Sequence, residues 1–173
     1  DAICEYGMQM AQITDETRAV LKSFLPAAAS VKNPIDMIAS APLEHYRRTT
    51  ETVLADPNVD MVIVIYLPFL GLKDIDVAKE LMRIRAEHPE KPIVGVFMTE
   101  SRFFSELSEM PVTVPFFMYV EQAVDGLMRL NQQRLWLARP EGKVPAYTVG
   151  MVCGSGMKSV IEGARAILSG DAN

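Results

Sequence analysis

The sequence has little cysteine and little histidine. Cys4 and Cys153 are the only two cysteines in 173 residues, too few for a disulfide framework, which favours a reducing cytoplasm. His45 and His88 each lack a Cys or His neighbour at the spacing of a metal site. We therefore expect no metal centre and interpret both histidines as structural. His45 fits a solvated helix face, and His88 fits a helix C-terminus, where the helix dipole favours a cation.

Positive charge and long apolar runs are also scarce. Lys and Arg number 17 against 22 Asp and Glu, which gives a net charge of −5 and no basic surface of the kind that nucleic acid requires. No apolar run approaches the roughly 20 residues of a membrane span. We expect neither a nucleic-acid partner nor a membrane partner. Apolar residues make up 49% of the chain, which is typical of a globular protein with a full core.

The sequence is organised around one apolar stretch, Met61 to Leu67 (MVIVIYL). It does not alternate with polar residues, so both faces of the strand have to be covered. This pattern predicts a central strand of a parallel sheet with helices on each face. A loop with Gly71 then leads to a helical pattern from Asp74. Ligands of open α/β sheets bind beyond the carboxyl ends of the strands, so the segment from Leu67 to Lys73 is the first candidate site.

Strands and helices alternate along the rest of the chain. Further strands are predicted at residues 8–13, 93–98 and 112–116, the last near an edge of the sheet because prolines remove donors there. Helices are predicted from the cap at Thr14 to before Pro26, from Ser40 and Pro42 through Leu54, from Asp74 to near His88, from a cap at Ser101, and over 121–138 with Ala123, Val124, Leu127 and Leu130 inward. The prolines at 26 and 34 bracket a predicted loop. The order predicts an α/β fold with a parallel sheet.

The two ends of the sequence differ from its middle. Residues 1–6 resemble the last turns of a helix that ends at Gly7. Because so short a helix would not form alone, we expect a strand and most of a helix before Asp1, and hence a fragment of a larger protein. After Pro140 the composition becomes that of a linker, followed by a helical period from Met157 to Leu168. We place one domain at 1–140 and a linker with a connector helix at 141–173.

Few side chains indicate chemistry of their own. Gly154-Ser155-Gly156 has Ser159 where a dinucleotide-binding loop needs a third glycine, so a linker is favoured. Cys153 has no histidine near it in the sequence and is interpreted as a packing or linker residue. Acidic residues at turns and helix starts are explained by capping. Asp36 lies with Asn33 in a nonregular segment, where it either caps the local backbone or presents oxygens to a ligand.

Several segments together carry a resemblance to a known family. Residues 24–36 (FLPAAASVKNPID), 53–60 (VLADPNVD), the apolar strand that ends at Pro68, and 91–98 (KPIVGVFM) resemble the NDP-forming acyl-CoA synthetases. These are ADP-forming acetyl-CoA synthetases related to succinyl-CoA synthetase. The resemblance covers roughly residues 7–140. It implies a flavodoxin-like subdomain with helices on both faces, whose first strand lies outside this sequence.

The resemblance also implies a role in catalysis by a larger enzyme. Such an enzyme converts an acid, CoA and ATP into acyl-CoA, ADP and phosphate through a phosphohistidine, which here would precede Asp1. This fragment would carry no catalytic residue and bind no cofactor, and would be inactive alone. CoA, ATP and Mg would belong to the full enzyme. The partners would be the CoA-binding, phosphohistidine and ATP-grasp subdomains, and a homo-oligomer is allowed.

The same resemblance assigns site residues. The helix after the apolar strand would point its N-terminus at the phosphate, since free backbone N–H groups attract anions. The loop facing the phosphohistidine would comprise Pro68, Gly71, Leu72, Lys73 and Asp74. Further residues lining the site would be Asn33, Asp36 and Thr99.

Three positions depart from the pattern of the family. Leu67 and Phe69 stand where members often carry polar residues, and Glu100 stands near common glycines, where its carboxylate would repel a phosphate. These departures leave three interpretations open: the loop uses only backbone N–H groups, this member takes an unusual acid substrate, or it no longer performs the phosphoryl step. A non-catalytic scaffold or regulatory module on the same fold is the alternative function. A flavin-binding domain is a weaker third hypothesis, because the sequence contains no hydroxyl-rich phosphate loop.

Overall fold

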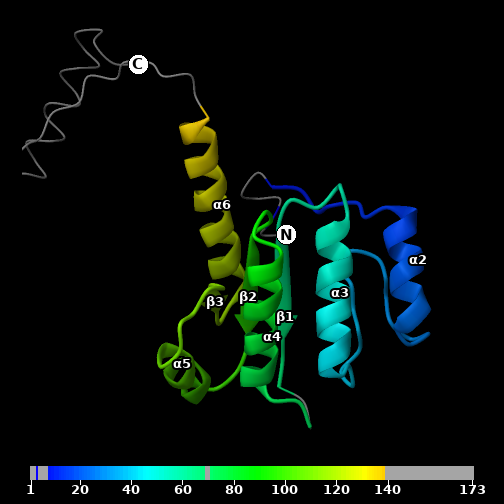
Figure 1. Ribbon diagram of the computed structural model, residues 1–173, viewed down its shortest axis with the longest axis horizontal. Helices are drawn as coiled ribbons and strands as arrows, with labels where there is room; N and C mark the ends of the chain where they lie inside the picture. Colours follow the sequence, from blue (N-terminus) through cyan, green and yellow to red (C-terminus); the bar gives the residue numbers. More distant parts are fainter. Residues whose placement is uncertain (1–2, 4–7, 69–70, 139–173) are drawn as a thin grey trace, which may run out of the picture. The chain divides into compact units, whose positions relative to one another are not determined.

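The structure is a computed structural model that describes residues 3, 8–68 and 71–138. The chain divides into two compact units, residues 1–132 and 133–173, and the account below concerns the first. Three parallel strands form its sheet in the order β1-β2-β3 (Figure 1). They are β1 (Val62–Tyr66), β2 (Ile93–Phe97) and β3 (Phe116–Phe117). The α/β class with a parallel sheet is confirmed.

The position of β1 within the sheet differs from the prediction. Within the described residues β2 holds the centre, with Val62 paired to Ile93 on one side and Phe116 paired to Gly95 on the other. β1 is an edge strand, so its prediction as the central strand is wrong for this part of the chain. An apolar pattern indicates that both faces of a strand are covered, but it does not indicate whether the strand pairs with one neighbouring strand or with two.

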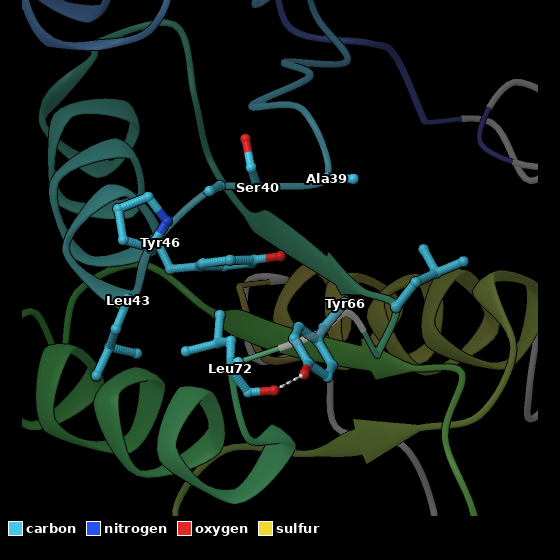
Figure 2. Close-up of a pocket in the computed structure, with 10 residues that line it drawn as sticks. Ala39, Ser40, Leu43, Tyr46, Tyr66 and Leu72 are labelled. Carbon is cyan, nitrogen blue, oxygen red and sulfur yellow. Dashed lines mark hydrogen bonds between the residues drawn. The ribbon is translucent and has the colours of Figure 1, made fainter.

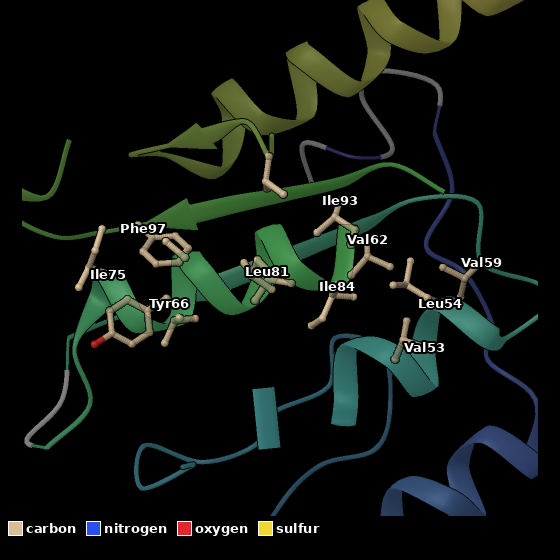
Figure 3. Close-up of a cluster of buried hydrophobic side chains, with 14 of the residues drawn as sticks. Val53, Leu54, Val59, Val62, Tyr66, Ile75, Leu81, Ile84, Ile93 and Phe97 are labelled. Atoms are coloured by element: carbon tan, nitrogen blue, oxygen red, sulfur yellow. The ribbon is translucent and has the colours of Figure 1, made fainter. Parts of the chain in front are cut away.

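Helices lie on both faces of the sheet, as predicted. One face of the sheet packs against helices in the larger of two hydrophobic core clusters. These helices are α2 (Asp15–Phe24), α3 (Leu43–Ala55), α4 (Asp74–Glu87) and α5 (Ser101–Ser108). Figure 3 shows this core, in which side chains from α3 and α4 meet those of β1 and β2. The rings of Tyr66 and Phe97 lie 5.1 Å apart, and Phe103 stacks on Phe97 at 4.9 Å.

The opposite face is covered by α6 (Val120–Leu137) alone among the described helices. Ala123 and Leu127 pack there on Val94 and Val96 of β2. Leu130 was predicted to face inward, but it is 48% exposed. A five-residue strand spans about 16 Å, which is the length of roughly ten helical residues, so the helix has reached the end of the sheet by this position.

Two predicted strands need correction. Residues 8–13 form no strand, because the side-chain amides of Asn33 and Asn58 donate to the carbonyls of Ala11 and Gln12, each at 2.9 Å, in place of a neighbouring strand. The strand predicted at 112–116 is β3 (Phe116–Phe117).

Helix starts were predicted to within a residue or two. Thr14 caps α2 as predicted, accepting a hydrogen bond from the Thr17 N–H. The cap residue of α3 is Pro42 and not Ser40, and that of α5 is Glu100, one residue before Ser101. The predictions for residues 139–173, which include Cys153 and the glycines at 154 and 156, lie outside the described residues.

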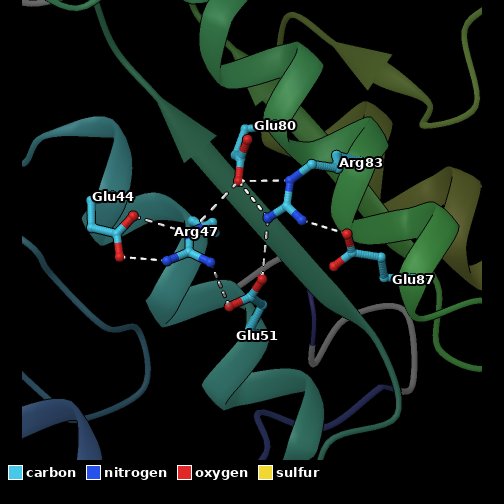
Figure 4. Close-up of polar contacts among 6 residues, drawn as sticks. All are labelled: Glu44, Arg47, Glu51, Glu80, Arg83 and Glu87. Carbon is cyan, nitrogen blue, oxygen red and sulfur yellow. Dashed lines mark hydrogen bonds and ion pairs between the residues drawn. The ribbon is translucent and has the colours of Figure 1, made fainter.

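Ion pairs connect α3 and α4 at the surface (Figure 4). Arg47 lies 2.6 Å from Glu44, and Arg83 lies 2.7 Å from Glu80 and 3.3 Å from Glu51. Both arginines are more than a third exposed, and pairs of this kind contribute little to stability. Of the helices described, none is both long and apolar enough to cross a membrane.

Candidate functional site

A cleft of about 320 Å³ lies at the carboxyl end of β1, beside the first turn of α3. Figure 2 shows its lining side chains, with Tyr46 and Leu43 from α3 and Tyr66 from β1. The predicted loop contributes Gly71 and Leu72. The other described lining residues are Ala39, Ser40, Ala41, Pro42 and Leu67.

Two tyrosines shape this cleft. The Tyr66 hydroxyl donates to the Leu72 carbonyl at 2.7 Å and so joins the end of β1 to the loop before α4. The ring of Tyr46 meets that of Tyr66 edge-on at 6.0 Å. Burial, and to a smaller extent the nearby Tyr66, raises the pKa of Tyr46 above its ordinary value.

The N-terminus of α3 opens onto the cleft without a side-chain cap. Its cap residue is Pro42, which makes no side-chain hydrogen bond to the first turn, and both Pro42 and Leu43 line the cleft. The first N–H groups of a helix carry a partial positive charge and are available to an anion when no side chain occupies them. On the other side of the cleft, Gly71 has φ = 96°, a conformation that glycine adopts without strain.

The N-terminus of α4 already holds a carboxylate. Asp74 accepts the N–H of Ile75 at Oδ1 and the hydroxyl of Thr99 at Oδ2, each at 2.8 Å. The structure thus brings together two of the residues assigned to the site, Asp74 and Thr99. An anion that approaches this helix meets the Asp74 carboxylate. The carboxylate in the first turn of α3, Glu44, is instead paired with Arg47 at 2.6 Å and lies outside the described lining of the cleft.

Four further assigned residues, Asn33, Asp36, Pro68 and Lys73, lie outside the described lining. Asn33 is exposed and donates to the Ala11 carbonyl. Asp36 accepts the N–H of Ile38 at 2.8 Å, and its own N–H and C=O pair with Ser30 at 2.9 Å. Asp36 thus caps its local backbone. Pro68 and Lys73 are exposed and do not belong to the described lining.

The two histidines have structural surroundings. His88 is the C-cap residue of α4, as predicted. His45 does not lie on a fully solvated face as expected, because its ring packs 6.0 Å from Phe24 and its Nδ1 is buried. Among the described residues, no three Asp, Glu, His or Cys side chains are grouped to hold a metal ion.

Sequence reasoning missed the part of the cleft that comes from residues 39–43, Tyr46 and Tyr66. Pro42 gave the start of α3 to within a residue, but no sequence signal indicated that this helix start faces the end of β1. The described lining carries hydroxyls and backbone N–H groups but no charged side chain. It can bind and orient a ligand, but it offers no nucleophile paired with a base.

The parallel sheet, covered by helices and with a cleft beyond a strand end, defines an α/β domain. Residues 1–110 match the model of the Ligase-CoA domain. The chain belongs to this family, and the resemblance to NDP-forming acyl-CoA synthetases is confirmed.

Two similar proteins are named as ADP-forming acetate–CoA ligases. The chain is 41% identical over 101 residues, 57% of this chain, to the alpha subunit of ADP-forming acetate–CoA ligase II from Pyrococcus furiosus. It is 32% identical over 82 residues, 47% of this chain, to ADP-forming acetate–CoA ligase I from Archaeoglobus fulgidus. The chain covers 22% of the first relative and 12% of the second.

Solved structures share the fold. PH0766 from Pyrococcus horikoshii is similar with a TM-score of 0.72 and 35% identity, over 80% of this chain and 33% of that one. The apo form of acetyl-coenzyme A synthetase 1 from Ca. Korarchaeum cryptofilum has a TM-score of 0.69 at 23% identity, over 78% of this chain and 30% of that one. The second likeness shows the fold alone.

Proposed function

We propose that this chain is one subdomain of an ATP-dependent, ADP-forming acyl-CoA synthetase, which converts an acid, CoA and ATP into acyl-CoA, ADP and phosphate. The observation that carries the proposal is the 41% identity to the alpha subunit of an ADP-forming acetate–CoA ligase. Since the chain spans 22% of that relative, the reaction needs further parts of the enzyme. The 173-residue chain alone forms no acyl-CoA.

The cleft at the end of β1 faces a phosphohistidine that another part of the enzyme carries. The uncapped first turn of α3 supports this role, because its N–H groups suit an anion. Gly71 and Leu72 of the loop line the cleft and contribute backbone N–H groups, while the Asp74 carboxylate is engaged with the Ile75 N–H and the Thr99 hydroxyl. Residues of this chain position the phosphate and exclude water, and the bond-making groups lie elsewhere.

The partners in this proposal are the CoA-binding, phosphohistidine and ATP-grasp subdomains of the same enzyme, in the cytoplasm. CoA, ATP and Mg bind to those parts. A second candidate function, a non-catalytic scaffold on the same fold, is favoured by one observation. The Asp74 carboxylate occupies the helix N-terminus that would otherwise attract the phosphate.

Labelling of the full-length protein with ATP carrying a radioactive γ-phosphate distinguishes the two functions. The ligase predicts an acid-labile label on a histidine outside this sequence, which is discharged when acid and CoA are added. The scaffold predicts no label. Gly71→Val should lower acyl-CoA formation about tenfold or more in the full-length enzyme, because a β-branched residue at φ = 96° strains the loop that lines the cleft. The exposed Val20→Ala is the control and should leave the rate unchanged.

A further inference from the structure

Ile38 has a strained backbone. Among the described residues it is the one residue other than glycine in the left-handed region, with φ = 62°. A side chain that branches at Cβ suits this conformation poorly, because Cβ lies too close to the following carbonyl oxygen. Such strain persists only where the surrounding structure imposes it, and it is concentrated at functional sites. Ile38 is half-buried but belongs to neither core cluster of the described residues, so packing of its side chain does not explain the strain.

Contacts on the N-terminal side hold Ile38 in this conformation. The Ile38 N–H donates to Oδ1 of Asp36 at 2.8 Å. Asp36 is itself fixed, since its N–H and C=O each pair with Ser30 at 2.9 Å. The residues on either side of it, Ile35 and Met37, pack against the larger core cluster. Because the free-energy cost of a left-handed residue is of the same order as the contribution of a hydrogen bond to a charged group, the Asp36 carboxylate is strong enough to decide the conformation of residue 38.

Contacts on the C-terminal side connect Ile38 to the cleft. Its carbonyl accepts the Ala41 N–H at 3.2 Å and closes a turn over Ala39 and Ser40. The residues of this turn line the cleft, as does Pro42, which precedes the first residue of α3. Figure 2 shows Ala39 and Ser40 along one side of the cleft. The direction in which the chain leaves Ile38 therefore decides where this side of the cleft lies.

We infer that Asp36 is a positioning residue, which holds the left-handed backbone of Ile38 and thereby sets the place of residues 39–42 beside the cleft. Asp36 acts through Ile38 and not on a ligand, since it lies outside the described lining. The effect on the enzyme rests on the proposed function, in which the cleft faces a phosphoryl group. A misplacement of about 1 Å at such a group can lower a rate by on the order of 100-fold.

A glycine substitution separates this role from that of a simple loop cap. Glycine adopts a left-handed backbone without strain. If Asp36 acts through the backbone of Ile38, then Ile38→Gly makes the carboxylate dispensable. If Asp36 acts instead through its charge or through the general stability of the loop, the carboxylate is needed as much after Ile38→Gly as before it.

A double-mutant cycle in the full-length protein, read as the rate of acyl-CoA formation, tests the role. Asp36→Ala should lower the rate about tenfold or more. Asp36→Asn should stay within about threefold of the natural protein, because the amide oxygen still accepts the Ile38 N–H. Adding Ile38→Gly to Asp36→Ala should restore the rate to within about threefold. Asp60→Ala is the matched control, since it removes an exposed carboxylate from another turn and should leave the rate unchanged.

Two results of this cycle would overturn the inference. One is a natural rate in Asp36→Ala. The other is a double variant that remains as slow as Asp36→Ala, because Asp36 would then act otherwise than through the backbone of residue 38.

Hydrogen exchange of the Ala41 amide in the same full-length variants gives a readout that does not depend on activity. This amide donates to the Ile38 carbonyl, so its exchange should be about tenfold faster in Asp36→Ala and should return to the natural rate in the double variant. An exchange rate that Asp36→Ala leaves unchanged would overturn the inference. If the natural protein forms no acyl-CoA, the proposed function fails, and the exchange rates alone decide whether Asp36 sets this side of the cleft.

Discussion

Thr99 donates a hydrogen bond of 2.8 Å from Oγ1 to Oδ2 of Asp74, and this bond ties the segment after β2 to the first turn of α4. The other oxygen of the same carboxylate accepts the N–H of Ile75. One side chain therefore links the sheet to the helix beside the cleft. The hydroxyl of Thr99 is the only part of its side chain that this arrangement needs.

Replacing Thr99 with valine should lower the free energy of unfolding by about 1 kcal/mol, because a partly buried hydrogen bond to a carboxylate is lost at nearly constant volume. Urea denaturation of the two proteins measures the change. The exposed Thr113→Val is the control and should differ from the natural protein by less than about 0.5 kcal/mol. Equal stability of the natural protein and Thr99→Val would show that the bond adds nothing.

The helices could be predicted from the sequence because their signals are local. The Thr14 hydroxyl accepts the N–H of Thr17, three residues later, and the Asp74 carboxylate accepts the N–H of the next residue in the first turn of α4. Such contacts need no knowledge of distant residues. The prediction of a strand at residues 8–13 was wrong because the contacts that decide the structure there are not local. Their carbonyls are taken by Asn33 and Asn58, which are distant in sequence.

The candidate site could be placed at a strand end, but its composition could not be predicted. The rule for open α/β sheets selects the end of β1 and therefore Gly71 and Leu72. Tyr46 and Tyr66 meet only because α3 packs beside β1, and no periodicity encodes that packing. Asn33 and Asp36 are polar loop residues whose side chains hydrogen-bond backbone groups outside the cleft, those of Ala11 and Ile38.

Gly95 in the central strand leaves no room for a side chain. A Cβ atom there would lie 2.5 Å from Cδ1 of Phe116 and 2.9 Å from Cε2 of Phe97. Gly95→Ala should therefore cost about 1–3 kcal/mol through overpacking, as measured by thermal or urea unfolding. Gly126→Ala is the control, because a Cβ there meets Phe117 Cζ at 3.1 Å and alanine favours the helix. Its effect should be below about 1 kcal/mol, and a larger loss there than at Gly95 would contradict the packing argument.

The Lys91 side chain caps the C-terminal end of α3. Its Nζ donates to the carbonyls of Leu54 and Asp56, each at 2.7 Å, where the helix leaves carbonyls unpaired and favours a cation. Lys91→Met keeps most of the apolar stem and removes the donors, so we expect a loss of about 1–2 kcal/mol in urea denaturation. Lys79→Met, at an exposed position of α4, should change stability by less than about 0.5 kcal/mol. An equal effect of both substitutions would refute the role of the ammonium group.

Asp56 joins the start of α2 to the turn before β1. Its side chain is buried, with 1% exposure, and accepts the Thr14 N–H and the Asn58 N–H, each at 2.8 Å. Burial raises the pKa of this carboxyl, but hydrogen bonds from Thr17, Thr14 and Asn58 together lower the pKa further, to below the ordinary value. The folded state thus favours the ionised form.

The lowered pKa gives a definite dependence of stability on pH. The contribution of Asp56 is fully present above the pKa of an unfolded aspartate, about 3.9, and is lost as the pH falls through the lower folded value. Asp56→Asn should cost about 1–3 kcal/mol at pH 7, because an amide cannot accept all of these bonds. The difference between the two proteins should shrink below about pH 4. Urea denaturation at pH 7 and at successively lower pH measures both effects.

Asp60→Asn provides the control for this pH dependence. Asp60 is exposed in the same turn, so its substitution changes the net charge by the same amount without removing a buried hydrogen-bond acceptor. It should leave stability at pH 7 within about 0.5 kcal/mol of the natural protein. If Asp56→Asn kept a constant deficit down to the lowest pH at which the protein folds, the loss would come from altered packing and not from the ionised carboxylate.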